Sequence, residues 1–344
     1  MANNDNKSIG RRGVLVIHPG AVGDVLLARP VLHLIRRRFP SHEVALLAGQ
    51  AVGMLLRDGR EIDRVFPLES THLTELFAGS RNVHPQFKAW LATCDFAVGW
   101  LQDWEGIVAD TLRILGVQQV YVKSPASHEL LSEHQAARYL EVIERRVFRV
   151  TTCKPLALSS TLRERGRQVL QQFDRGHQKR LVVIHPGSGS AYKCLEAPRL
   201  ASVIEWLCQE GTTPMLLEGP ADREPVAQVL AAVTVALPVI CGLDLSAAAA
   251  VLSHADLYLG NDSGMTHLAA ALSVPTIACF GPTSPRRWAP LGPRLSILTG
   301  VLCGCPTRSD VERCRERVCL HIATERIIEA SRALLMKQST TPIA

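Results

Sequence analysis

No apolar run in this sequence approaches the about 18 residues that a membrane-spanning helix requires. The opening residues, MANNDNKSIGRR, also lack an apolar stretch of signal-peptide length. These two absences argue against a membrane-embedded or secreted protein. We therefore expect a protein of the cytosol.

Several nucleotide- and nucleic-acid-binding patterns are absent as well. Neither of the two IHPG loops spells GxGxxG, which disfavours a dinucleotide-dependent oxidoreductase, and the second loop is not a GxxxxGK[ST] Walker loop. Basic and aromatic residues do not interleave as on a single-strand-binding platform, and no zinc-finger spacing occurs, so we expect no nucleic-acid partner. The modest formal charge of +6 fits an acidic small molecule or an anionic membrane surface better.

The ten cysteines do not indicate a disulfide scaffold, because a 344-residue chain without an export signal belongs to a reducing compartment. Four of them fall in the segment CGCPTRSDVERCRERVC, residues 303–319. Zinc sites usually contain CxxC pairs, whereas this segment has CxC followed by wider and irregular spacings. We expect free thiols in a basic loop. A structural metal site on Cys303, Cys305, Cys314 and Cys319 is the alternative.

The sequence does contain enough apolar material for packed cores, with 47% hydrophobic and 20% charged residues. Its length exceeds the size at which one core usually keeps growing, so two domains are expected. An internal echo supports this, because VLVIHPGAVGD at residues 14–24 reappears as LVVIHPGSGSA at residues 181–191. Each copy reads as a strand that ends in a Pro-Gly turn before a helical pattern, which is the opening of a βαβ unit.

Strand-like runs alternate with helix-like stretches in both halves, and residues 128–146 have the periodicity of a long amphipathic helix. This alternation predicts an α/β fold with two Rossmann-like, doubly wound parallel sheets. The expected domains are residues 1–174 and 175–321, and a helix at 322–337 could return to the first domain. The first half has predicted strands at 43–48, 63–68, 95–100 and 118–123 after the opening strand, and the second half has LVVIH, TPMLLE, PVI, DLYLG and VPTIACF.

The loop after the strand DLYLG has the residues of an anion site. In open parallel sheets, ligands bind beyond the carboxyl ends of the strands. Asp262 or Asn261 can cap the following helix, and Ser263 and Gly264 can present backbone N–H groups to a phosphate. His267 falls about one turn into that helix. The alternatives are a helix cap without a ligand and a structural histidine.

The mid-chain loop HPGSGSAYK suits an anion too. Ser188 and Ser190 lie among glycines that allow close backbone approach, and a cation follows at Lys193. A flexible loop with a solvated lysine is the alternative. If this loop faces the loop that contains Ser263 across one sheet edge, the anion-binding interpretation is the stronger one.

The first Pro-Gly loop, HPGAVGD, places an acid at a helix start. Gly20 and Gly23 shape a tight turn from strand to helix, and Asp24 follows. On this pattern alone Asp24 is either a helix cap or a general base. A carboxylate in a cleft that faces an anion-binding loop can accept a proton from an incoming hydroxyl.

Taken together, these stretches resemble glycosyltransferase family 9, the ADP-heptose:lipopolysaccharide heptosyltransferases. The resemblance rests on GAVGDVLLARPVLHLIRRRFP, HPGSGSAYK and GNDSGMTHLAAALSVPTIACFGPTSPRRWAP, and weaker correspondences extend it over essentially the whole chain. It implies a GT-B fold, in which two Rossmann-like domains face each other across a cleft. It also implies inverting transfer of a heptose, or a related sugar, from ADP-heptose to a lipopolysaccharide inner-core acceptor. The transfer would need no metal or cofactor, and the enzyme would contact the inner membrane peripherally.

The same resemblance implies roles for individual residues. Asp24 occupies the position of the catalytic base, in a loop shaped by Gly20 and Gly23. A ribose contact falls within EGPADRE, with Asp222 as the first candidate and Glu224 as the second. The other donor contacts fall on Ser188, Ser190, Lys193, Asp262, Ser263, Gly264 and His267.

Two other functions remain open on the sequence alone. A nucleotide-sugar epimerase of the non-hydrolysing kind shares the two-domain architecture. It would need further acid/base residues in the first domain, where only Asp24 is evident. A non-catalytic protein that binds sugar nucleotides is the second alternative.

Overall fold

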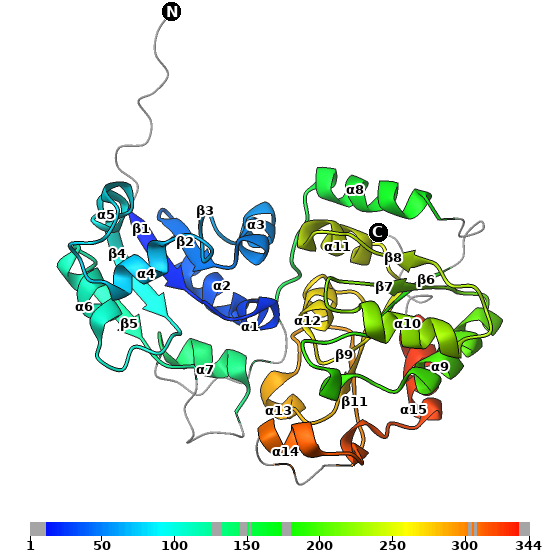
Figure 1. The fold of residues 1–344 in the computed structure, drawn as a ribbon. Helices are drawn as coiled ribbons and strands as arrows, with labels where there is room; N and C mark the ends of the chain where they lie inside the picture. The colour runs from blue at the N-terminus through cyan, green and yellow to red at the C-terminus, as the bar shows by residue number, and fades with distance from the viewer. Residues whose placement is uncertain are drawn as a thin grey trace, which may run out of the picture. The chain divides into compact units, whose positions relative to one another are not determined.

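The computed structural model describes residues 12–125, 133–144, 150, 153–173, 180–301, 305 and 308–336. The chain forms two compact units, Met1–Val150 and Thr151–Ala344. Each unit is built on its own parallel sheet with helices on both faces, as Figure 1 shows. Within the described residues, no helix is long and apolar enough to cross a membrane.

The first unit contains a five-stranded sheet in the order β3-β2-β1-β4-β5, with every pair of neighbours parallel. This order is that of a Rossmann sheet, in which the chain starts at the centre and winds outward in both directions. The strands are β1 (Gly13–Ile17), β2 (Glu43–Ala48), β3 (Arg64–Pro67), β4 (Cys94–Gly99) and β5 (Gln119–Val122).

The central strands of this sheet are apolar on both faces, because helices cover both. Leu15 and Ile17 point to one face and pack with the side chains Phe87 and Leu112 of the covering helices. Val14 and Val16 alternate with them and are equally buried. The helices of this unit are α1 (Val22–Leu27), α2 (Arg29–Arg38), α3 (Gln50–Asp58), α4 (His72–Phe77), α5 (Pro85–Leu91), α6 (Ile107–Ile114) and α7 (Gln135–Glu141).

The second unit repeats the design with six parallel strands in the order β11-β10-β9-β6-β7-β8. The two strands that open the echoed sequences, β1 and β6, therefore occupy equivalent central positions in their sheets. The strands are β6 (Leu181–His185), β7 (Thr213–Leu217), β8 (Val239–Ile240), β9 (Leu257–Asn261), β10 (Thr276–Phe280) and β11 (Leu295–Thr299).

One face of the second sheet is covered by α9 (Ala197–Gln209), α10 (Arg223–Ala232) and α15 (Thr324–Met336), whose apolar residues share a core cluster with the strands. The predicted C-terminal helix therefore packs on the sheet of its own unit. α8 (Ser160–Gln171) packs on α11 (Leu245–Leu252). The further helices are α12 (Gly264–Ala271), α13 (Pro285–Trp288) and α14 (Arg308–Arg313), with short 3₁₀ turns η1 (Ala191–Lys193) and η2 (Val318–Leu320).

Because of the packing of α8, the domain boundary lies earlier in the chain than expected. The expected division at residue 174 would leave α8 in the first unit, whereas the structure divides the chain at Val150 and Thr151. Gly166 of α8 lies so close to α11 that an added Cβ would come within 2.4 Å of the Ala250 backbone. α8 is thus the first element of the second unit.

The strands predicted from sequence are confirmed, and one was missed. β11 has the short sequence LSILT, and only Leu298 among its residues is buried, because β11 is an edge strand of the sheet. Of the long helix predicted at 128–146, the structure describes α7, Gln135–Glu141, with turns to residue 144. Residues 128–132 and 145–146 of that prediction lie outside the described residues.

Candidate functional site

Each sheet has one place where the strand order reverses. It lies between β1 and β4 in the first unit and between β6 and β9 in the second. Loops that leave the carboxyl ends of two such strands turn to opposite faces, and ligands bind in the crevice between them. In the second unit these are the HPGSGSAYK loop after β6 and the NDSG loop after β9.

Asn261, the last residue of β9, holds the loop after β6 in place. Its side chain is buried, its Oδ1 accepts a hydrogen bond from the Leu195 backbone N–H at 3.0 Å, and its Nδ2 donates to the Pro186 carbonyl at 2.8 Å. A longer contact of 3.3 Å reaches the Gly187 carbonyl. One buried amide therefore ties the start of the loop to its end, which argues against the interpretation of this loop as flexible.

Asp262 connects three loops. Its Oδ2 lies 2.8 Å from Lys193 Nζ and also accepts a hydrogen bond from the Thr283 hydroxyl in the loop after β10. Its backbone carbonyl accepts a hydrogen bond from Ser188 Oγ at 2.7 Å. The structure thus brings Asp262 together with Ser188 and Lys193, from which it is separated by 74 and 69 residues in sequence. Thr283 belongs to the same cluster and was missed by the sequence analysis.

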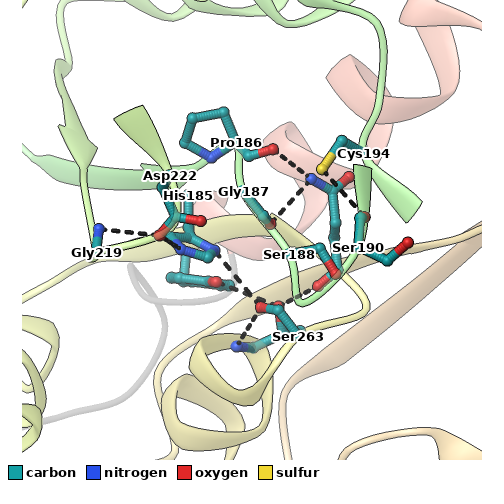
Figure 2. Close-up of polar contacts among 12 residues, drawn as sticks. His185, Pro186, Gly187, Ser188, Ser190, Cys194, Gly219, Asp222 and Ser263 are labelled. Atoms are coloured by element: carbon teal, nitrogen blue, oxygen red, sulfur yellow. Dashed lines mark hydrogen bonds and ion pairs between the residues drawn. The ribbon is translucent and has the colours of Figure 1, made fainter. Parts of the chain in front are cut away.

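Ser263 is the N-cap of α12, so the expectation that Asp262 or Asn261 caps this helix is wrong. The Ser263 Oγ accepts from the Thr266 backbone N–H at 3.4 Å and lies 3.5 Å from His185 Nδ1 (Figure 2). The side chains of Asn261 and Asp262 already bind the loops described above, so the next residue, Ser263, caps the helix.

His185, at the end of β6, links Ser263 to Asp222. Its Nε2 donates to Asp222 Oδ2 over 2.8 Å, and its Nδ1 lies 3.5 Å from the Ser263 hydroxyl. The Gly219 N–H donates to the same Asp222 oxygen at 2.9 Å (Figure 2). Burial alone would raise the pKa of Asp222, but the hydrogen bond and charge interaction with His185, together with the Gly219 N–H, hold it below its ordinary value.

Gly187 is required by the close approach of Asp222. A Cβ on residue 187 would lie 1.7 Å from Asp222 Oδ1 and 2.9 Å from Asp222 Cβ. A Cβ on Gly189, two residues later, would meet no atom within 4 Å. The glycine that matters in the second Pro-Gly loop is therefore the first, and its reason is the buried carboxylate beside it.

The edge formed by these loops is suited to an anion. The N–H groups of Gly264 and Met265 begin α12 and have no intrahelical acceptor, and the helix dipole is positive at this end. The hydroxyl groups of Ser188 and Ser263 and the ammonium of Lys193 lie in the same network. His267 is buried in the first turn of α12, and Ser190 caps the turn η1 through its contact with the Tyr192 N–H.

A pocket of about 600 Å³ adjoins the loop after β6. Its lining includes Ser188, the first turns of α9 and α10, and the exposed Glu224. Asp222 does not line it, because that carboxylate is buried against His185 and Gly219. Of the two acidic residues considered for a ribose contact, Glu224 is the one with access to the pocket.

In the first unit, Asp24 lies in the first turn of α1, directly after the loop that follows β1. Its Oδ2 accepts a hydrogen bond from the Ala21 N–H at 3.2 Å, so this residue does help to cap the start of the helix. A Cβ on Gly20 would lie 2.9 Å from Asp24 Cβ and 2.8 Å from His18 Cε1, and Gly23 is buried within α1. Small residues thus let the backbone wrap closely around the carboxylate.

A buried aromatic cluster lies beneath this loop and was not recognised from the sequence. His18 packs against Trp100, which follows β4, and against Tyr139 of α7, with ring centroids 5.5 and 5.0 Å apart. The His18 Nδ1 accepts from the Gly20 N–H at 3.2 Å. Burial lowers the pKa of His18 to about 4, so the ring is neutral at pH 7 and fixes the turn that leads to Asp24.

None of the nine cysteines in the described part of the chain forms a disulfide bond. Within the same residues, no group of three or more His, Cys, Asp or Glu side chains is arranged to hold a metal ion. Cys305, Cys314 and Cys319 line one small void together with Tyr192 and Arg317. Cys303, the fourth thiol of the alternative metal site, lies outside the described residues.

Comparison with known proteins agrees with this architecture. The protein is 26% identical to lipopolysaccharide heptosyltransferase 3 of Escherichia coli K12, over 91% of this chain and 95% of that protein. A family 9 glycosyltransferase from Veillonella parvula superposes with a TM-score of 0.80 at 19% identity, covering 95% of this chain and 98% of the other. Escherichia coli ADP-heptose lipopolysaccharide heptosyltransferase II gives a TM-score of 0.70 at 19% identity, covering 95% and 100%.

The pair of Rossmann-like units is that of the GT-B fold, as these two structures indicate. Residues 104–316 match the family model of glycosyltransferase family 9 (heptosyltransferase). This match covers more than half of the chain and includes all the loops of the second-unit edge. The chain therefore belongs to glycosyltransferase family 9 and is a glycosyltransferase.

Proposed function

We propose that this enzyme transfers a heptose from ADP-heptose to a lipopolysaccharide inner-core acceptor, with inversion and without a metal ion. The observation that carries the donor half of the proposal is the preorganised edge of the second sheet. There, Asn261 fixes the loop after β6, and Asp262 joins Lys193 to the start of α12. An ADP-sugar presents a diphosphate, and this edge offers it hydroxyls, an ammonium and helix N–H groups.

The same groups would stabilise the leaving group. As the bond between the sugar and the diphosphate breaks, negative charge accumulates on the phosphate oxygens. Lys193 and the N–H groups of Gly264 and Met265 are fixed before the reaction begins, so they need no rearrangement to meet that charge. Glu224 in the adjoining pocket is suited to the ribose hydroxyls. Ser188, Ser190, Ser263 and His267 complete the proposed donor contacts.

Asp24 is the proposed general base. It would take the proton from an acceptor hydroxyl as that oxygen attacks the anomeric carbon of the donor. Its place directly after the loop that follows β1, at the carboxyl edge of the first sheet, suits this role. The acceptor would be bound by the first unit, beside the loop that His18 and Gly20 shape. A lipid-linked acceptor implies peripheral contact with the inner membrane from the cytoplasmic side.

Replacement of Asp24 by Asn tests the base. The Asn side-chain oxygen can still accept from the Ala21 N–H, so the helix start is kept while the base is lost. We expect turnover with ADP-heptose and a Kdo-lipid A acceptor to fall about 10²- to 10⁴-fold, with donor affinity by isothermal titration changed less than about twofold. Asp110→Asn is the matched control, because Asp110 is an exposed acid in the first turn of α6.

Unchanged turnover of Asp24→Asn would remove the base assignment. Titration of the wild-type enzyme with ADP, ADP-heptose and UDP separates the donor proposal from the base. We expect ADP and ADP-heptose to bind and UDP to bind more weakly. Binding of UDP in preference to ADP, or hydrolysis or epimerisation of the donor with no transfer, would overturn the proposed reaction.

A further inference from the structure

Arg317, in the cysteine-containing segment, lies at the large pocket of the second unit. It lines the 600 Å³ pocket together with Ser188 and Glu224. Its backbone has φ 43° and ψ 38°, the left-handed region that non-glycine residues rarely adopt. Such a conformation is unfavourable for a residue with a side chain and persists where the surrounding structure holds it.

The Arg317 guanidinium is fixed against the loop after β6. Its central carbon lies 5.3 Å from the centroid of the Tyr192 ring, a cation–π contact. Tyr192 belongs to η1, between Ser190, which caps that turn, and Lys193, which pairs with Asp262. The two ends of this loop are in turn held by Asn261. Arg317 is therefore positioned by the same framework as Lys193.

Among the residues that the structure describes, the ion pairs around this edge involve Lys193 but not Arg317, so the charge of Arg317 can meet a ligand. The carboxylates of Asp222, Asp262 and Glu224 surround the loop, and Lys193 is paired with Asp262. Within the described residues, Arg317 has no carboxylate partner, whereas its neighbour Arg313 is paired with Asp310 at 3.0 Å. A half-buried guanidinium that is held in place but not neutralised is suited to an anion that arrives with a ligand.

We propose that Arg317 binds the diphosphate of the nucleotide-sugar donor, as a second cation beside Lys193. This inference rests on the proposed function, because it takes the donor to be a nucleotide sugar. The planar guanidinium can donate two parallel N–H bonds to phosphate oxygens, which an ammonium cannot. Arg317 would then add a neutralising charge that the Lys193–Asp262 pair supplies only in part. The cysteine-containing segment would serve to deliver this arginine to the pocket.

Calorimetric titration of Arg317→Ala with ADP and with adenosine tests the proposal. We expect ADP affinity to fall about 10- to 100-fold and adenosine affinity to change less than about twofold, because only ADP carries the diphosphate. Arg317→Lys keeps the charge but loses the paired donors, so its ADP affinity should be intermediate. Arg315→Ala is the matched control, since Arg315 is an exposed arginine of the same segment.

Each outcome bears on a defined claim. If the wild-type enzyme binds no ADP, the proposed function fails. If the wild-type enzyme binds ADP and both Arg317 variants match it, only the role of Arg317 is overturned. Equal losses for ADP and adenosine would also overturn it, since they would indicate a general disturbance of the pocket. Weakened competition by inorganic pyrophosphate in Arg317→Lys would support a contact to phosphate even if Arg317→Ala does not fold.

Discussion

Replacement of Gly187 by Ala should disturb the donor edge through a single added carbon. The new Cβ would lie 1.7 Å from Asp222 Oδ1 and 2.9 Å from Asp222 Cβ, so the carboxylate must move away. Moving it breaks the hydrogen bonds from His185 Nε2 and the Gly219 N–H. Hydrogen bonds to a charged group contribute about 1.5–3 kcal/mol each, so the loss of two should lower the free energy of unfolding by about 3–6 kcal/mol.

Gly189→Ala provides the control in the same loop. Its Cβ meets no atom within 4 Å, and neither glycine has a positive φ. We expect its stability to stay unchanged or to rise by at most about 1 kcal/mol. Urea unfolding of the two variants, with ADP titration of each, checks the contrast. ADP affinity should fall in Gly187→Ala alone, because His185 then no longer orients Ser263.

A double-mutant cycle with Asp222→Ala isolates the cause. In the Asp222→Ala background the carboxylate is gone, so Gly187→Ala should cost markedly less than it does in the wild-type protein. Equal stability of Gly187→Ala and Gly189→Ala would show that the contact with Asp222 does not destabilise the protein. An equal cost of Gly187→Ala in both backgrounds would show the same.

The remaining predictions concern pH and metal. Because burial lowers the pKa of His18 from 6.5 to about 4, the unfolded chain binds a proton that the folded chain does not between these values. The free energy of unfolding should therefore fall by up to about 3 kcal/mol as pH drops from 6.5 to 4. His18→Gln should flatten this part of the profile in urea unfolding, and an unchanged slope would show that another group is responsible. Transfer activity should be unaffected by EDTA, and a loss that Mg²⁺ restores would contradict the metal-independent mechanism.

The architecture was largely predictable because it depends on local patterns. Parallel strands buried on both faces give short apolar runs, and the IHPG echo marks the central strand of each sheet. The edge strand β11 was not predicted because it is only partly buried and lacks a continuous apolar run. The domain boundary was not predicted correctly because the position of α8 depends on the close packing of Gly166 against Ala250. These two residues are far apart in sequence.

The sequence indicated which loops form the candidate site, but not what each residue does there. Lys193, Ser188 and Asp262 were expected near a phosphate, and the structure joins them in one network. The helix cap was misassigned because Asp262 is taken by Lys193 and Thr283, partners that only the fold brings near. His185 lies at the end of a strand, and no sequence motif indicated a functional role for this residue. Its role depends on Asp222, which belongs to another strand–helix connection.

A crystal structure of the protein with ADP-heptose would test the central claim most directly. We expect the diphosphate at the carboxyl edge of the second sheet, within hydrogen-bond distance of the Gly264 N–H and of Lys193 or Ser188. A diphosphate bound elsewhere, with the edge around Asp262 and Ser263 empty, would contradict it.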